Sequence, residues 1–111
     1  MISPPLHSML GLCQRAGQLV SGDLAAEQAL RRGHAHLVLV AGDASERTRA
    51  KFAHLAAEAG APCYVVGTRE TLGKAIGKAA RAVVVVRSRD FTRGILGILQ
   101  REGLAPVTGR G

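Results

Sequence analysis

Aromatic residues are scarce in this sequence. Phe52, Tyr64 and Phe91 are the only ones, and tryptophan is absent. Because 47% of the residues are hydrophobic, the chain can still build a core, but that core must be aliphatic. The same scarcity argues against recognition of nucleic-acid bases by stacking on a platform of aromatic rings.

Cysteines and long apolar runs are also rare. Cys13 lies on the apolar stripe of a predicted helix and Cys63 begins a predicted strand, so we interpret both as reduced core residues of a cytoplasmic protein. No apolar run approaches the roughly 18–20 residues of a membrane span. The N-terminal sequence MISPPLHSML lacks the basic start and long apolar centre of a signal peptide. We therefore expect no membrane partner.

Acidic residues are outnumbered by basic ones. The 111 residues include 15 Lys and Arg but only 8 Asp and Glu, which gives a net charge of +7. Such a balance favours an anionic partner, such as nucleic acid or an acidic membrane. The length is that of one domain.

Helical and strand patterns alternate along the chain. Apolar periodicity and capping signals predict helices over about 4–16, 23–32, 45–59, 68–77 and 88–102, with short strands over about 18–21, 36–41, 63–66 and 82–86. The resulting order, α-β-α-β-α-β-α-β-α, predicts a single-domain α/β fold, a three-layer α/β/α sandwich with a four-stranded mixed sheet. We assign residues 1–102 to this domain and residues 103–111 to a flexible C-terminal tail.

A strand that runs directly into a glycine-marked helix is the central feature of the sequence. The strand ends at Ser21, Gly22 allows a sharp turn, and the helix begins at Asp23. Ser21 or Asp23 is expected to cap the helix through its side-chain oxygen. Such a helix start can bind an anion, which on a basic chain is plausibly a nucleic-acid phosphate. The alternative is a well-capped helix with no ligand.

Basic residues gather in two further places. Arg31 and Arg32 occupy the last turn of the same helix, before Gly33. The glycine-rich segment 73–81 carries three more cations, Lys74, Lys78 and Arg81. Both segments lie at strand–helix junctions, but their spacing in sequence leaves open whether they adjoin. If they do, one edge of the sandwich offers amides, small residues and cations to a sharply bent RNA backbone.

Motifs for other chemistries are incomplete. Residues 67–74 resemble a phosphate-binding loop but have one residue too many between the glycines, and Ala75 stands where a magnesium-binding hydroxyl belongs. Asp43 lacks the neighbouring carboxylates of a phospho-acceptor site. His34 and His36 have no further zinc ligands at suitable spacing. We therefore predict no cofactor, no metal ion and no catalytic residue.

Four segments resemble the kink-turn RNA-binding ribosomal protein family, which includes the archaeal large-subunit kink-turn protein. They are LGLCQRAGQLVSG (10–22), HLVLVAGDAS (36–45), PCYVVGTRETLGKAIGKAARAVVVV (62–86) and the closing helix from Asp90. Together they cover almost the whole chain in the right order. The combination of RAG-x-LVSG with LG-x-AIGK is most similar to the small bacterial YlxQ-like members.

The resemblance implies an α/β/α sandwich that binds kinked RNA and is not an enzyme. Members grip a bulge flanked by sheared G·A pairs, using the glycine-led start of the second helix and a hydrophobic loop before the last strand. By position, Gly22 is the helix-start glycine and Asp23 follows it. The loop contacts fall on Ala80, Arg81, Ala82 and Val83.

Four positions depart from the family pattern. The polar Asn-Glu pair that reads guanines falls on Leu24 and Ala25, the helix lysine on Gln28, and an acidic residue on Gly42. Leu24 and Ala25 have no polar side-chain atom and cannot form hydrogen bonds with bases. Loss of the Asn-Glu pair removes ~1–3 kcal/mol of discrimination between bases for each good bidentate contact, a figure taken from protein–DNA complexes. Binding through backbone and charge does not depend on them.

The leading hypothesis is a cytoplasmic RNA-binding protein that recognises kinked, ribosomal or other structured RNA and is a monomer when free. Ribosomal proteins are further possible partners. One alternative is a protein-interaction module that docks on a ribosomal or RNA-modification partner through the less polar helix tip. Another is an enzyme that acts on a phosphorylated ligand. The predicted RNA-binding residues are Ser21, Gly22, Asp23, Leu24, Gln28, Arg31, Arg32, Lys74, Lys78, Arg81, Ala82 and Val83.

Overall fold

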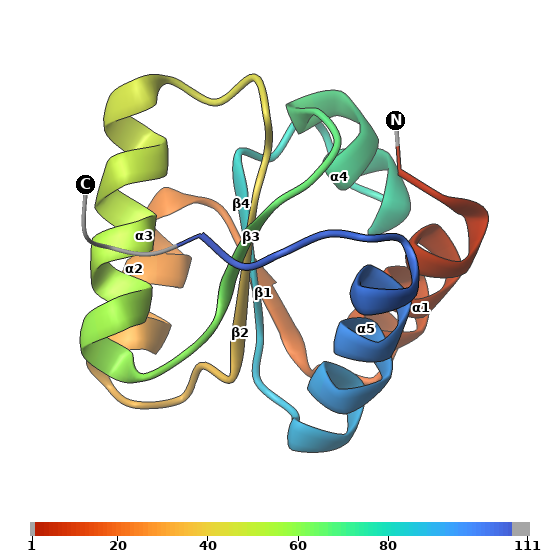
Figure 1. Cartoon of the computed structure of the whole chain (residues 1–111), viewed down its shortest axis with the longest axis horizontal. Helices are drawn as coiled ribbons and strands as arrows, with labels where there is room; N and C mark the ends of the chain where they lie inside the picture. The colour runs from red at the N-terminus through yellow and green to blue at the C-terminus, as the bar shows by residue number, and fades with distance from the viewer. Residues whose placement is uncertain (1, 108–111) are drawn as a thin grey trace.

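The computed structural model describes residues 2–107, which form five helices and four strands in alternation (Figure 1). The strands are β1 (Leu19–Ser21), β2 (Leu37–Val40), β3 (Cys63–Val65) and β4 (Val83–Val86). The helices are α1 (Pro4–Arg15), α2 (Asp23–Arg31), α3 (Glu46–Ala59), α4 (Arg69–Ala75) and α5 (Arg89–Arg101). The element order predicted from the sequence is confirmed.

The sheet is mixed and has the strand order β1-β4-β2-β3. β4 is antiparallel to both of its neighbours, whereas β2 and β3 are parallel. In this register Val84 lies between Ser21 of β1 and Leu39 of β2. Every residue of the two central strands, β2 and β4, is fully buried. Their unbroken apolar sequences therefore arise because both faces of the sheet are covered.

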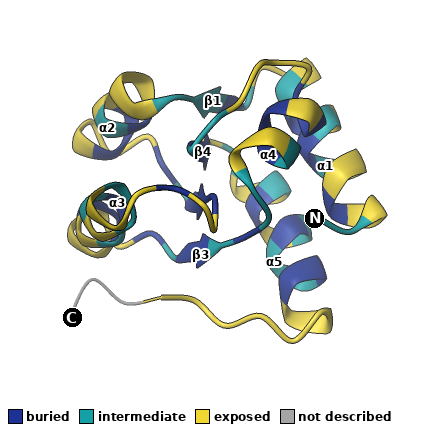
Figure 2. Cartoon of the chain, turned by 90° about the horizontal axis from the view of Figure 1, so that it is seen from above, coloured by how far each residue is buried: buried dark blue, intermediate teal, exposed yellow. Residues whose placement is uncertain are grey.

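Helices cover the sheet on both sides, as the view from above shows (Figure 2). α2 and α3 pack on one face, and α1, α4 and α5 pack on the other. Leucine, valine, isoleucine and alanine dominate the core, and Phe52 is the largest fully buried side chain. The three-layer sandwich and its aliphatic core are therefore confirmed. In residues 2–107 no helix has the length and apolar character needed to cross a membrane.

Strand direction places the connecting loops at two opposite ends of the sandwich. The C-terminal ends of β1, β2 and β3 and the start of β4 lie at one end, because β4 alone runs the other way. The β1–α2 connection and the loop before β4 meet at this end. The α2–β2 and β4–α5 connections meet at the opposite end. The predicted RNA-binding residues are thus divided between two places.

Side-chain oxygens cap four of the five helices. The oxygens of Ser3, Ser45, Thr68 and Ser88 accept hydrogen bonds from the backbone amides three residues further on. Ser45 thus fixes the start of α3, and Ser88 fixes the start of α5.

The segment after α5 crosses the outer edge of β3 (Figure 1). The Val107 amide donates to the Cys63 carbonyl at 2.7 Å in an antiparallel bridge. Val107 of the predicted tail thus has a backbone contact with the sheet, and residues 108–111 lie outside the described residues. Flexibility of the tail stays a prediction.

Both cysteines are buried free thiols. Burial raises the pKa of Cys13 and of Cys63 to about 11. Each thiol therefore stays protonated at neutral pH and packs as a small apolar side chain, as the sequence predicted.

Candidate nucleic-acid interface

The turn from β1 into α2 depends on Gly22. Its backbone has φ 95° and ψ 155°, a conformation almost confined to glycine. A Cβ at this position would meet nothing within 4 Å, so the requirement is one of backbone conformation and not of space. The glycine also leaves the turn into α2 without a side chain, so a ligand can approach the backbone closely there.

No side chain caps α2, and the predicted cap at Ser21 or Asp23 is wrong. The Ser21 hydroxyl accepts a hydrogen bond from Arg81, and the Asp23 carboxylate is bound by Lys51. The first intrahelical hydrogen bond of α2 runs from the Ala26 amide to the Gly22 carbonyl. The amides of residues 23–25 precede it, and they lie at the positive end of the helix dipole.

The two segments whose proximity the sequence left open do adjoin. Arg81 Nε donates to Ser21 Oγ at 3.2 Å, and the Gly22 amide donates to the Val83 carbonyl at 3.0 Å. We call this contact between Ser21, Gly22, Arg81 and Val83 the glycine junction. It brings the start of α2 and the loop before β4 together across 60 residues of sequence.

The loop before β4 is fixed to α4. The Lys78 amide donates to the Gly73 carbonyl at 2.8 Å, and the Arg81 amide donates to the Arg69 carbonyl at 3.0 Å. Gly73 is required for this packing, since a Cβ there would lie 2.0 Å from the Ala79 carbonyl oxygen. The Arg81 guanidinium also donates to two carbonyls within the loop. The loop backbone is therefore held in place without any ligand.

Charged side chains form a row of ion pairs along the side of α2 that packs against α3. Lys51 Nζ lies 2.6 Å from Asp23 Oδ1 and 2.8 Å from Glu27 Oε1, and Arg31 Nε lies 2.9 Å from Glu27 Oε2. Hydrogen bonds from Lys51 first, and then from Arg31, lower the pKa of Glu27. Hydrogen bonds to Asp23 and then Glu27 raise the pKa of Lys51. Lys51 thus compensates the negative charge at the tip of α2.

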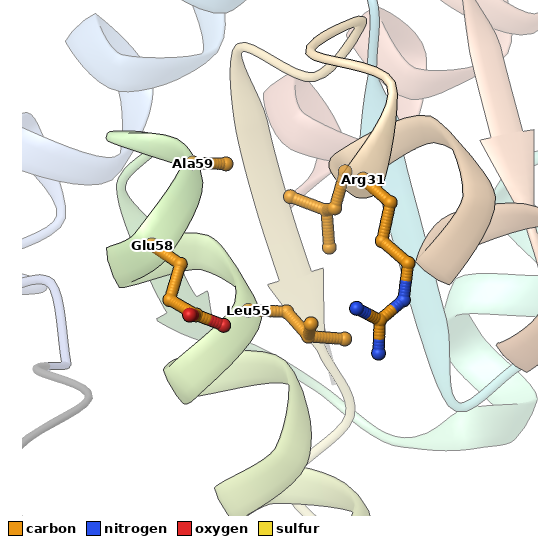
Figure 3. A pocket seen from close by; sticks show the side chains of 5 residues that line it. Arg31, Leu55, Glu58 and Ala59 are labelled. Carbon is orange, nitrogen blue, oxygen red and sulfur yellow. The ribbon is translucent and has the colours of Figure 1, made fainter.

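Arg31 and Arg32 lie away from the glycine junction. Arg31 is nine residues after Gly22, which places it about 14 Å further along the helix axis. Figure 3 shows its side chain beside Leu55, in a shallow groove that Glu58 and Ala59 line from α3. Lys74 and Lys78, by contrast, belong to α4 and the loop that the junction holds, and both are exposed. The structure therefore groups the lysines, but not the two arginines, with Gly22.

Comparison with known proteins identifies the family. Residues 5–94 match the Ribosomal protein L7Ae/L30e/S12e/Gadd45 family. The chain belongs to this family. Its resemblance to the kink-turn RNA-binding ribosomal proteins, predicted from four segments of sequence, is confirmed.

Two bacterial relatives share the name RNA-binding protein YlxQ. The chain is 36% identical over 91 residues to the protein of Bacillus subtilis (strain 168), across 82% of this chain and 91% of that one. It is 30% identical over 79 residues to the protein of Enterococcus faecium, across 71% and 77%.

A solved structure, described as that of a protein with unknown function from Bacillus halodurans C, is also similar. It has a TM-score of 0.84 and 34% identity, and the match covers 88% of this chain and 99% of that one.

Two of the four positions where this L7Ae-family chain departs from the family pattern, Leu24 and Ala25, form an apolar helix tip. Leu24 is 70% exposed, more than any other large hydrophobic side chain in residues 2–107, and Ala25 beside it is also exposed. Gly42 is exposed, and its carbonyl accepts from Arg49. Ala82 and Val83, at the positions of the family's hydrophobic loop, are half-buried and buried, and Gln28 is exposed on α2.

Lys51 is a residue that the sequence analysis did not single out. It binds two carboxylates of α2, one of them 28 residues earlier in the chain. No local pattern marks such a contact. Within residues 2–107, no three His, Cys, Asp or Glu side chains come close enough together to hold one metal ion.

Proposed function

We propose that this protein binds structured RNA with a sharply bent backbone, of the kink-turn type, at the glycine junction. The observation that carries the proposal is the contact of Arg81 with Ser21, which joins the bare start of α2 to the loop before β4. Family membership and the names of the bacterial relatives support RNA as the ligand. We propose that it acts by binding alone, as a cytoplasmic monomer when free, without catalysing a reaction.

The chemistry of the junction favours phosphate and shape over base identity. Amides 23–25, Arg81, Lys74 and Lys78 offer donors and positive charge to phosphates. Leu24 and Ala25 offer only apolar contact where the family has polar side chains. We propose that affinity for kinked RNA is retained while discrimination by base contacts is reduced.

A binding assay with three RNAs tests the proposal: a kink-turn, the same RNA with its G·A pairs disrupted, and a plain duplex of equal length, each across a salt series. We expect the kink-turn to bind most tightly, with a smaller margin than a member carrying Asn-Glu would show. Negligible binding to all three would overturn RNA binding. Equal binding to all three that fades with salt would remove kink-turn specificity only.

Exposed Leu24 favours a second candidate, a module that docks on a ribosomal protein or an RNA-modification enzyme. A 70% exposed leucine at a helix tip is an apolar contact point of the kind that protein interfaces bury. The test is a pull-down of ribosomal proteins with and without nuclease, using Leu24→Glu as the control. Capture that survives nuclease and is lost in Leu24→Glu supports docking, and capture lost with nuclease supports RNA binding.

A further inference from the structure

A second basic surface lies on the side of α2 opposite to its ion-paired side. A groove of about 180 Å³ runs between α2, β1 and the end of β4, and its polar walls are Gln28, Arg32, His34 and Arg87. The small apolar side chains of Val20, Ala25 and Ala29 line the rest, so the groove reaches the tip of α2 at Ala25. We call this surface the arginine groove. The sequence singled out Arg32 but gave no reason to connect it with Arg87.

Backbone hydrogen bonds fix both walls of the arginine groove. The His34 amide donates to the Ala29 carbonyl at 2.9 Å, directly after Gly33 reverses the chain with φ 74°. On the other wall, the Arg87 amide donates to the Gln18 carbonyl at 2.8 Å, where β4 ends beside β1. The two arginines are 55 positions apart in the sequence, yet hydrogen bonds fix the backbone at each of them.

The cations of this groove are uncompensated. No acidic side chain lines it, and in the part of the chain that the structure describes neither Arg32 nor Arg87 forms an ion pair. Arg31, the residue before Arg32, is instead paired with Glu27. Two exposed guanidinium groups that share a groove match phosphate oxygens well, because each presents a planar fork of donors. The small residues between them let an RNA backbone approach.

We propose that the arginine groove is a second RNA-contact surface, which binds backbone phosphates independently of the glycine junction. The choice of RNA as ligand rests on the proposed function. Arg32 is ten residues after Gly22, or about 15 Å along the helix, which exceeds the screening length of about 8 Å at physiological salt. The two surfaces therefore act as separate electrostatic sites. A short kinked RNA occupies the glycine junction alone, and an RNA with an extended stem or strand reaches both.

The experiment compares two RNAs that share one kinked segment, the first with minimal stems and the second with one stem extended. The variants are Arg32→Ala/Arg87→Ala and the charge reversal Arg32→Glu/Arg87→Glu. Arg101→Ala is the control for loss of one exposed charge, since it lies on α5, on the other face of the sheet. Thermal unfolding checks that each variant is folded.

We expect the double alanine variant to bind the extended RNA about tenfold more weakly than the wild type. Its slope of log affinity against log salt is expected to be smaller by about 1.4–1.8, which corresponds to two phosphates. Binding of the minimal RNA should change less than twofold. The charge reversal should enlarge the loss on the extended RNA only.

Two results overturn the proposal. One is wild-type affinity of the charge-reversed variant for the extended RNA, and the other is an equal loss on both RNAs. Neither result bears on RNA binding at the glycine junction, which is measured with the minimal RNA and the wild-type protein. Failure of that RNA to bind would instead count against the proposed function.

Discussion

The two sides of α2 use the same residue types in opposite ways. On the side that packs against α3, Asp23, Glu27, Arg31 and Lys51 neutralise one another. On the side of β1, Arg32 and Arg87 have no ion-pair partner within residues 2–107, and at the tip Arg81 holds the glycine junction. The difference shows that a net charge of +7 does not by itself locate a binding surface. What counts is which cations the fold leaves uncompensated.

The largest contrast is expected between the glycines at the two ends of α2. Gly22 has φ 95° and Gly33 has φ 74°, and an added Cβ would meet nothing at either place. Both alanine variants store backbone strain, of about 1–3 kcal/mol each. Only Gly22→Ala disturbs the proposed RNA contact, so we expect it to weaken binding of a short kink-turn on the order of 100-fold, and Gly33→Ala about twofold.

Isothermal titration with the same short RNA checks this pair, with thermal unfolding as the measure of strain. Equal affinities in the two variants would show that the start of α2 is not the RNA contact.

The next contrast is between two arginines. Arg81→Ala removes the hydrogen bond to Ser21 and the guanidinium contacts that hold the loop, so we expect about a tenfold loss of RNA affinity, as for a hydrogen bond of 1.5 kcal/mol. Arg31→Ala should weaken binding about twofold, since this arginine is already paired with Glu27. The loss of RNA affinity in Lys78→Ala is expected to lie between those of Arg81→Ala and Arg31→Ala. A stronger effect for Arg31 than for Arg81 would move the interface toward the other end of α2.

Restoring polar side chains at the apolar tip should sharpen specificity. We expect Leu24→Asn with Ala25→Glu to raise the ratio of affinities for a kink-turn and its G·A-disrupted version by about fivefold, the effect of ~1 kcal/mol and the lower end for one bidentate base contact. The ratio, measured at one salt concentration, is the readout. Leu24→Ser with Ala25→Ser is the control for loss of the apolar surface. An unchanged ratio in the Asn-Glu variant alone would mean that the tip does not contact bases.

The smallest effect concerns the ion-paired side. Lys51→Ala leaves Asp23 and Glu27 less compensated, so we expect RNA affinity about twofold below that of the wild type at low salt. At high salt this difference should disappear. The pKa of Glu27, lowered mainly by Lys51, should rise toward its ordinary value in the variant. In the wild type the Lys51–Glu27 ion pair stabilises the fold at pH values above the ordinary glutamate pKa. This contribution is lost as the pH falls through the lowered pKa of Glu27. An NMR titration of the Glu27 carboxyl measures the change.

Local patterns predicted the fold, and distant contacts decided the site. The alternation of elements and the helix end at Gly33 follow from residues a few positions apart, and both are as predicted. The cap of α2 was predicted wrongly because Arg81 and Lys51, 60 and 28 residues away, bind the two side chains that local rules assign to the cap. For the same reason the sequence could not show that Arg81 adjoins Ser21, or that Arg32 shares a groove with Arg87.

The hydrogen bonds from Lys78 to Gly73 and from Arg81 to Arg69 have a consequence for kinetics. They hold the loop before β4 in its final shape, so an RNA that docks there does not have to wait for a segment of protein to fold. Association should then be limited by encounter, and electrostatic steering should make its rate strongly dependent on salt. Any slow step in complex formation would belong to the RNA, as it bends to fit.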